Sequence, residues 1–442
     1  MEEKLVISSE LIDDYRRMSV AMPEKKMHVE TGEKALYSIG YDGNLHLLYE
    51  NIKEHKGWES VNLTEVLGSK YGLSDYEVTT FDVRRNEMKK VIVLAVRCGK
   101  KYQIFYGESN QKVCMEWKRL PTTEQLEQAE VDAIYLSVFD KYHCVICDWK
   151  VNDRITRYFV NPEDAEWRRH ELPADFEKTT GAILGRTASD KVDGIYTLGK
   201  LYGETQLLYT PLYNRFNKEI PPLSIRFQTE KMTGAMAVLA DEEKKYSHLF
   251  VCGALGLYVY PAMEQKDLCR PRLLIHSEQF DKMSSLCVYQ TDEEIVVTGV
   301  GSAGNLFSCR ASVEQWLTPK AWRKETIIEK GILYAESIWD INQQKEIIFG
   351  VSRDGKEYEM LERSELTGLW SRGNVRIPDS GKPARKIPSY VTRVNSSQKQ
   401  VEISASRTCC VYINEQYYRL GTDPQVISCD ETGTLRIVEE AN

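Results

Sequence analysis

Tryptophans followed by basic residues are the side chains best suited to chemistry in this sequence. Four such pairs recur, and they are Trp117 with Arg119, Trp167 with Arg169, Trp322 with Arg323, and Trp370 with Arg372. An aromatic face can stack on the apolar C–H surface of a sugar, while a guanidinium donates hydrogen bonds to hydroxyl or carboxylate oxygens. These eight residues are therefore the predicted ligand-binding residues. The same pattern also suits packing, because a tryptophan can wedge between two sheets while the basic residue after it reaches solvent.

Motifs of familiar catalytic and nucleotide-binding sites are absent. The sequence has no Gly-x-x-x-x-Gly-Lys-Ser/Thr, no His-Glu-x-x-His and no Gly-x-Ser-x-Gly. Cys144 and Cys147 have the spacing of a zinc or redox motif, but they lie in a strand-like run, where residues three apart face opposite ways. Acidic residues at 241–243 and 292–294 occupy equivalent turns and are typical of solvated charge. The sequence predicts no catalytic residue, no metal and no cofactor.

Composition and charge narrow the range of partners. The chain of 442 residues has 58 Lys and Arg against 66 Asp and Glu, a net charge of −8, which does not favour binding to nucleic acid over a broad basic face. No apolar run is long enough for a spanning helix, and the start lacks the basic and apolar regions of a secretory signal. The eleven cysteines are an odd number, and many lie in apolar runs. We therefore predict no membrane insertion and a cytoplasmic location, with export by a non-Sec route left open.

Short β-rich runs make up most of the chain. They include 91–96, 295–300 and 346–350, and turn residues separate them. Helical periodicity is confined to Ser9–Met22, ahead of Pro23, and to a short stretch at Thr122–Ala129. We expect an all-β protein with a short N-terminal helix.

A repeated module organises these strands. Its aromatic or basic closing segments begin at Trp58, Trp117, Trp167, Phe216, Arg270, Trp322, Trp370 and Tyr418. A period of about 50 residues with four short strands per unit is typical of a β-propeller. Counting strands favours about eight four-stranded blades, with seven as the alternative. We expect residues 1–30 to be an N-terminal segment and residues 31–442 to be one propeller domain, closed by pairing of the N- and C-terminal strands in a shared blade.

One blade resembles those of a known family. The run from Asp42 to Tyr49, followed by Gly57 and Trp58, resembles the blade signature of propeller lectins of the fucose-binding and tectonin types. The resemblance implies pockets between blades, each with an arginine, a glutamate and an aromatic residue. Here the aromatic-plus-basic half recurs, and Glu116 and Glu166 directly precede two of the tryptophans.

Three functions are open at this point. The first is a non-enzymatic, lectin-like module that binds a glycan through the eight tryptophan and arginine residues. The second is a protein-interaction platform, an effector or cargo component, that uses one propeller face and the N-terminal segment. The third, and least favoured, is an enzyme with carboxylates around the channel. The expected partner is thus a glycan or a protein, and the oligomeric state is left open.

Overall fold

The structure is a computed structural model of the whole chain. It describes residues 2–7, 17–20, 27–29, 34–40, 42–51, 57–86, 89–109, 115–139, 142–151, 154–163, 166–170, 172–173, 176–186, 193–212, 223–226, 232–241, 246–261, 271–281, 283–301, 304–352, 357–364, 367–378, 390–395, 400–405, 409–413, 416–420, 425–428 and 435–439.

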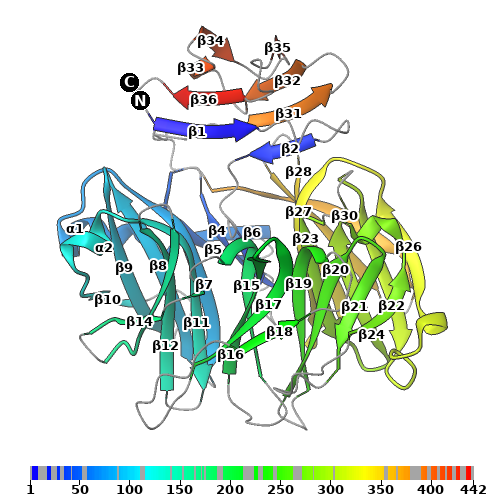
Figure 1. Cartoon of the computed structure of the whole chain (residues 1–442). Helices are drawn as coiled ribbons and strands as arrows, with labels where there is room; N and C mark the ends of the chain where they lie inside the picture. Colours follow the sequence, from blue (N-terminus) through cyan, green and yellow to red (C-terminus); the bar gives the residue numbers. More distant parts are fainter. Residues whose placement is uncertain are drawn as a thin grey trace.

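Seven four-stranded antiparallel sheets form the blades of a propeller (Figure 1). Each blade consists of four strands that follow one another in the chain. Blade 1 contains β3 (Met27–Val29), β4 (Ala35–Ile39), β5 (Leu45–Asn51) and β6 (Gly57–Asn62), and blade 2 contains β7 (Tyr76–Asn86), β8 (Lys89–Cys98), β9 (Lys101–Ser109) and β10 (Glu116–Leu120). Blade 3 contains β11 (Glu130–Phe139), β12 (Tyr142–Val151), β13 (Arg154–Val160) and β14 (Arg168–His170). Blade 4 contains β15 (Phe176–Arg186), β16 (Asp193–Leu201), β17 (Glu204–Pro211) and β18 (Leu223–Arg226).

Blades 5 to 7 continue the same pattern. Blade 5 contains β19 (Met232–Asp241), β20 (Tyr246–Gly253), β21 (Gly256–Tyr260) and β22 (Arg272–His276). Blade 6 contains β23 (Ser285–Gln290), β24 (Glu294–Val300), β25 (Leu306–Ser312) and β26 (Arg323–Ile328). Blade 7 contains β27 (Ile332–Asp340), β28 (Lys345–Ser352), β29 (Glu357–Ser364) and β30 (Trp370–Arg376). The propeller prediction is confirmed. The favoured number of eight blades is wrong, and the alternative of seven is right.

The two ends of the chain explain the miscount, because their strands lie outside the blades. They form two further four-stranded sheets, in the orders β1-β36-β33-β34 and β2-β31-β32-β35, drawn above the propeller in Figure 1. The strands are β1 (Glu2–Ile7), β2 (Arg17–Val20), β31 (Tyr390–Asn395), β32 (Gln400–Ala405), β33 (Cys409–Ile413), β34 (Gln416–Leu420), β35 (Gln425–Ser428) and β36 (Leu435–Glu439). N- and C-terminal strands therefore pair with each other, but they do so in these terminal sheets and not in a shared blade.

The predicted N-terminal helix is corrected where the structure describes it. Residues 17–20 of the predicted Ser9–Met22 helix form strand β2, which pairs with β31, while residues 9–16, 21 and 22 lie outside the described residues. Pairing with a distant strand has overridden the local helical pattern. The other predicted helix is present as α2 (Glu124–Glu127), and Thr123 caps it by accepting a hydrogen bond from the Leu126 backbone N–H. None of the described helices is long and apolar enough to cross a membrane.

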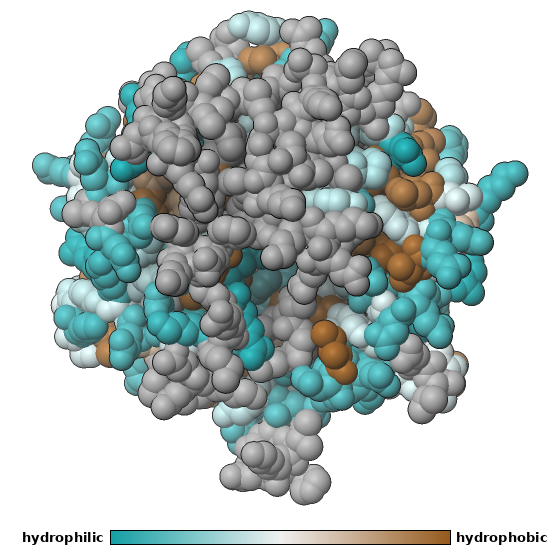
Figure 2. Space-filling model, turned by 90° about the horizontal axis from the view of Figure 1, so that it is seen from below, coloured by the Kyte–Doolittle hydropathy of each residue, from teal (hydrophilic) through white to brown (hydrophobic). Residues whose placement is uncertain are grey.

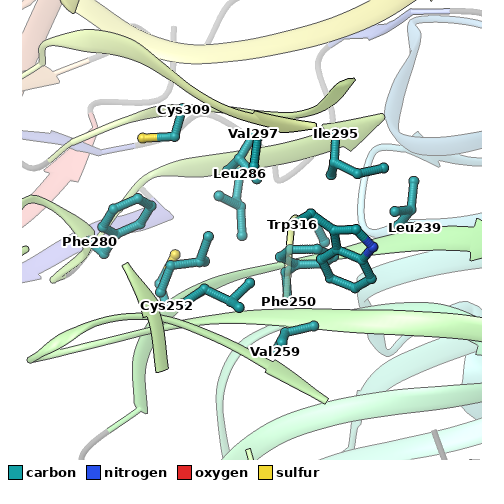
Figure 3. Packing of buried hydrophobic residues seen from close by; sticks show 14 of the residues in the cluster. Leu239, Phe250, Cys252, Val259, Phe280, Leu286, Ile295, Val297, Cys309 and Trp316 are labelled. Atoms are coloured by element: carbon teal, nitrogen blue, oxygen red, sulfur yellow. The ribbon is translucent and has the colours of Figure 1, made fainter. Parts of the chain in front are cut away.

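The blades are held together by the side chains between their faces. Figure 3 shows the cluster between blades 5 and 6, where Phe250 of β20 faces Ile295 and Val297 of β24. Trp316 fills the outer part of this interface and stacks on Phe250, with ring centroids 5.8 Å apart. Because neighbouring blades cover both faces of a middle strand, such strands read as continuous apolar runs in the sequence.

The strand order defines two faces of the propeller. The first strands of neighbouring blades contact one another, which places them nearest the axis. The turns between the first and second strands lie on one side, called here the lower face, as in Figure 1. Helix α1 (Glu65–Tyr71), α2 and the terminal sheets lie towards the opposite, upper face. Figure 2 looks onto the lower face, whose described rim is largely hydrophilic.

Candidate functional site

Each of the four tryptophans predicted to bind a ligand donates a hydrogen bond from its indole N–H to another group of the protein. Trp117 is 3% exposed and donates from Nε1 to the Leu63 carbonyl oxygen at 2.8 Å. Trp167 donates to the Pro121 carbonyl oxygen at 2.6 Å, and Trp322 donates to that of Trp316 at 2.8 Å. Trp370 donates to Glu325 Oε1 at 3.2 Å. These contacts agree with the packing interpretation of the tryptophans.

The predicted arginines lie on separate blades. Arg119 pairs with Glu127 at 2.9 Å, Arg372 pairs with Glu359 at 2.7 Å, and Arg323 pairs with Glu294. Arg169 is exposed on β14. The structure thus distributes the eight predicted residues around the ring and does not bring them together, and their role in ligand binding stays a prediction.

Cys144 and Cys147 agree with the structural interpretation given to them. Both thiols are buried in β12, and burial raises the pKa of Cys147 well above its usual value. A thiol held protonated in this way is a poor metal ligand or nucleophile. Within the described residues, no group of three or more His, Cys, Asp or Glu side chains is placed to hold a metal ion.

Side chains of the first strands connect neighbouring blades near the axis. In the part of the chain that the structure describes, four backbone N–H groups of first strands donate to a side chain of the preceding blade. The pairs are Leu136 N–H to Asp82 at 2.9 Å, Ala182 to Tyr135 at 3.0 Å, Ala335 to Ser285 at 3.1 Å, and Val29 to Glu336 at 2.8 Å. We call these four acceptors the edge caps, because each satisfies a donor on the unpaired edge of a first strand.

A buried ionic network spans blades 3 and 4. Arg157 donates two hydrogen bonds to Asp148, at 2.7 and 2.9 Å, and a third to Thr197 of the next blade at 3.0 Å. Lys178 pairs with Asp132 at 2.5 Å and with Asp148 at 3.4 Å. Burial would raise the pKa of Asp148, but the charges and hydrogen bonds of Arg157 and Lys178 lower it overall. Two cations thus balance two carboxylates, which suits a structural role.

A different cluster lies at the lower face between blades 2 and 3. Tyr106 and Glu108 are two residues apart on β9 and so point to the same side of the strand, while His143 lies near the start of β12. The Tyr106 hydroxyl lies 2.5 Å from Glu108 Oε1 and contacts His143 Nδ1. Lys89, at the start of β8, donates to Glu108 Oε2 at 3.2 Å. We call these four residues the Tyr106 cluster.

The cluster combines buried and accessible groups. The side chain of His143 is 13% exposed, that of Glu108 is 33% exposed and that of Lys89 is 52% exposed. The Tyr106 phenol is buried among them. Solvent therefore reaches the cluster from the lower face, at its lysine and carboxylate.

The surroundings fix the protonation states. Burial raises the pKa of Tyr106, and the hydrogen bond and charge of Glu108 raise it further. Burial lowers the pKa of His143, with the charge of Lys89 acting in the same direction and that of Glu108 against it. Burial would raise the pKa of Glu108, but hydrogen bonds from Tyr106 and Lys89 lower it overall. At neutral pH the cluster holds a phenol, a neutral imidazole and a carboxylate.

These states determine the direction of the hydrogen bonds. The single hydroxyl proton of Tyr106 goes to Glu108, because a carboxylate can only accept. The phenol oxygen then accepts from Nδ1–H of His143, which places the imidazole lone pair on Nε2. A carboxylate thus acts through a phenol on an imidazole and orients it as a base, much as a third group orients the base of a catalytic triad.

The sequence analysis missed this cluster. Tyr106 and His143 are far apart in the chain, and neither belongs to a motif. The available signal was positional, because Tyr106 and Glu108 lie near the end of a third strand and His143 lies near the start of the second strand of the next blade. Both places face the same side of a propeller. Using that signal requires the register between neighbouring blades, which the sequence does not contain.

Comparison with known proteins gave matches among solved structures. No family model and no curated protein matches the sequence. Solved structures that match include a puromycin hydrolase S511A mutant complexed with PGG, at 10% identity and a TM-score of 0.49, covering 88% of this chain and 60% of that one. A post-proline cleaving enzyme from Rickettsia typhi matches at 11% identity and a TM-score of 0.47, covering 86% of this chain and 58% of that one.

A third match comes from an analysis of two prolyl endopeptidases, at 12% identity and a TM-score of 0.44, covering 86% of this chain and 52% of that one. This chain therefore spans about 60% of the length of the puromycin hydrolase and less of the prolyl endopeptidase. At such identities and TM-scores, the activities of these proteins are not carried over to this chain.

The expected function is corrected by these comparisons. We expected a non-enzymatic protein, either lectin-like or an interaction platform. The matching structures named above are described as a hydrolase and as peptidases, which contradicts that expectation, and the activity of this chain is taken up below as a proposal.

Proposed function

We propose that this protein is a hydrolase in which His143 is the general base. The observation that supports the proposal is the hydrogen-bonded chain from Glu108 through Tyr106 to His143, which opens to the lower face. Burial keeps the imidazole neutral at physiological pH, and a base must be unprotonated to accept a proton.

The reaction follows from the direction of the chain. Nε2 of His143 accepts a proton from a water molecule as its oxygen attacks the substrate. The imidazolium formed is stabilised by the Tyr106 oxygen and the Glu108 carboxylate, and it then gives the proton to the leaving group. The Lys89 ammonium, 3.2 Å from Glu108, supplies positive charge beside the site for an oxyanion that develops in the transition state. Tyr106 and Glu108 are positioning residues, and His143 is the catalytic residue.

The test measures hydrolysis of p-nitrophenyl acetate and of N-acetyl amino acid p-nitroanilides by the full-length protein. His143→Gln keeps a polar side chain but removes the basic nitrogen, and we expect kcat/KM to fall by about 100-fold or more. Tyr106→Phe removes the connection to Glu108, and we expect a fall of about 10-fold together with a lower kinetic pKa for the base. A purely structural role for Tyr106 would not move that pKa.

A matched control is available on the same face. Lys345 of β28 donates to Glu362 at 3.3 Å, as Lys89 does to Glu108, but Met360 and Lys34 stand there in the places of Tyr106 and His143. Lys89→Gln should reduce the rate, whereas Lys345→Gln should leave it unchanged. Wild-type rates no higher than those of His143→Gln with every probe would overturn the proposal.

A further inference from the structure

A short segment of blade 3 lies beside the Tyr106 cluster and carries an acidic residue that the proposed mechanism does not use. Strands β12 and β13 pair with Val145 opposite Val160, and the segment 161–163 follows directly after this pair. His143 lies two residues before Val145 on β12. Because the two strands are antiparallel, the continuation of this register brings Pro162 level with His143. Glu163 therefore follows next to the imidazole.

Two hydrogen bonds fix the segment 161–163 in this place. The Glu163 backbone N–H donates to Oδ1 of Asn161 at 2.9 Å, which closes a tight turn. The ammonium of Lys118, on β10 of blade 2, donates to the Pro162 carbonyl oxygen at 2.5 Å, and Pro162 is buried. The segment is thus attached to both blades that form the Tyr106 cluster, and the backbone of Glu163 is held beside it.

The charge of Glu163 acts on the two buried members of the cluster. Burial lowers the pKa of His143 overall, while the charges of Glu108 and Glu163 act to raise it and that of Lys89 acts to lower it. Burial is also the largest cause of the raised pKa of Tyr106, and Glu163 adds to the effect of Glu108 there. The imidazole is therefore in a field with more negative than positive charge.

Glu108 and Glu163 differ in what they can bind. Glu108 already accepts from the Tyr106 hydroxyl and from the Lys89 ammonium. Glu163 is exposed, and within the described residues no lysine, arginine or histidine side chain forms an ion pair with its carboxylate. A solvated carboxylate beside a base attracts a cation that arrives with a substrate, and it disfavours an anion.

We propose that Glu163 determines specificity at this site and selects substrates that carry an ammonium or guanidinium group. The inference rests on the proposed function, because it concerns the substrate on which His143 acts. The cation binds the Glu163 carboxylate at the lower face, and the bond to be hydrolysed is thereby held beside Nε2 of His143. Two sources supply such a cation, the side chain of a basic amino acid and a free α-ammonium group, and the test separates them.

Hydrolysis by the full-length protein tests the preference with p-nitroanilides that differ in charge. The Nα-acetyl-lysine compound carries a side-chain cation, the norleucine compound carries only an α-ammonium group, and the Nα-acetyl-norleucine compound carries neither. The assay is run at about pH 6.5, where an α-amino group is protonated. We expect kcat/KM to be about 5-fold higher for one of the two cationic compounds than for the neutral one, as for an exposed ion pair. The compound preferred identifies the source of the cation.

Variants of one exposed side chain show whether Glu163 causes the preference. Glu163→Gln should remove it and leave kcat/KM for the neutral compound within about 2-fold of the wild-type value. Glu163→Lys should reverse it, so that the Nα-acetyl-glutamate compound becomes a better substrate than the neutral one. Glu166→Gln is the matched control, since Glu166 is an exposed glutamate three residues further along the chain, and it should keep the preference. An unchanged preference in Glu163→Gln, or an equal loss in Glu166→Gln, would overturn the proposal.

A binding measurement separates this inference from the proposed function. The full-length protein with ¹³C-labelled histidines is titrated with n-butylammonium chloride, and with potassium chloride at equal ionic strength as the control. The NMR signal that is missing in His143→Gln identifies His143. We expect n-butylammonium to shift this signal in the wild-type and Glu166→Gln proteins but not in Glu163→Gln. That result without hydrolysis of any p-nitroanilide would refute the proposed function and support the cation preference, whereas an unshifted His143 signal in the wild-type protein would overturn the preference.

Discussion

The junctions between blades 2 and 3 and between blades 7 and 1 have the same framework with different residues at two positions. In each, an acidic edge cap, Asp82 or Glu336, accepts from a backbone N–H of the next blade, at Leu136 or Val29. Counting residues along the paired strands from each cap then shows which residues occupy equivalent positions at the two junctions. The equivalent residues are Lys89 and Lys345, Glu108 and Glu362, Tyr106 and Met360, and His143 and Lys34.

The difference lies in the group that meets the shared glutamate. At the junction of blades 7 and 1, Glu362 contacts Lys34, which also pairs with Glu50 at 2.7 Å. Burial alone would lower the pKa of Lys34, but Glu362 and Glu50 raise it overall. A permanent cation there forms a fixed ion pair. At the junction of blades 2 and 3 the same place holds His143, whose pKa is lowered by burial so that the imidazole is neutral at physiological pH. Tyr106, at the place of Met360, links this imidazole to the carboxylate of Glu108. One framework therefore holds an ion pair between blades in one place and, in the other, the imidazole that we propose as the general base.

The largest effect is expected when the junction of blades 2 and 3 receives the residue found at the junction of blades 7 and 1. In His143→Lys the ammonium should pair with Glu108, as Lys34 pairs with Glu362, so the fold is retained. The general base is lost, and we expect hydrolysis of p-nitrophenyl acetate to fall by about 100-fold or more. Thermal unfolding of the same preparation is the control. Retained activity in a folded His143→Lys protein would contradict the assignment of the base.

Lys34, which occupies the position equivalent to His143, is tested by measuring protein stability, since no catalytic role is proposed for it. Lys34→Met keeps the length of the side chain but leaves Glu50 and Glu362 without their shared cation. We expect the free energy of unfolding in urea to fall by about 1–3 kcal/mol, because a partly buried charge loses its partner. Lys89→Met is the matched control, and since Lys89 is half exposed its effect should stay below about 1 kcal/mol. Equal losses from the two variants would contradict the distinction.

The smallest expected effect is on the pH dependence of stability, and it depends on the pairing of Lys34 with Glu362. The folded-state pKa of Glu362 is lowered by Lys34 against the effect of burial, so the pair contributes stability above the ordinary pKa of glutamate, near 4.5. That contribution is lost as pH falls through the lowered pKa. In Lys34→Met the pKa of Glu362 should rise, and the loss of stability between pH 5 and 3 should shrink by about 1 kcal/mol. The measurement is the urea midpoint at each pH for both proteins, and parallel curves would contradict it.

The sequence allowed the kind of fold to be predicted, because blades repeat and each repeat leaves its own turn and aromatic closure. The number of blades was harder to obtain. The strands at 390–395 and 400–405 have lengths within the range of the blade strands, and only their pairing, β31 with β2 and β32 with β35, places them outside the ring. The tryptophans were ambiguous for a related reason, since a ring that packs on the next blade and a ring that binds a sugar need the same residue type.

The candidate site depends on relations between blades that no local pattern encodes. Tyr106 meets His143 because the Asp82 cap sets β11 at one register against β7, and a shift of two residues would separate them. Alternation along β9 could predict that Tyr106 and Glu108 share a face. It could not predict which residue of the following blade they meet.

The edge caps have a consequence for solubility. A strand with a free edge is a template on which another extended chain can add, and this is a common route to aggregation. In the described first strands, Asp82, Tyr135, Ser285 and Glu336 occupy donors on those edges. A defect at one of these residues leaves a backbone N–H without its acceptor and frees the edge, so we expect both a lower free energy of unfolding and self-association in concentrated solution.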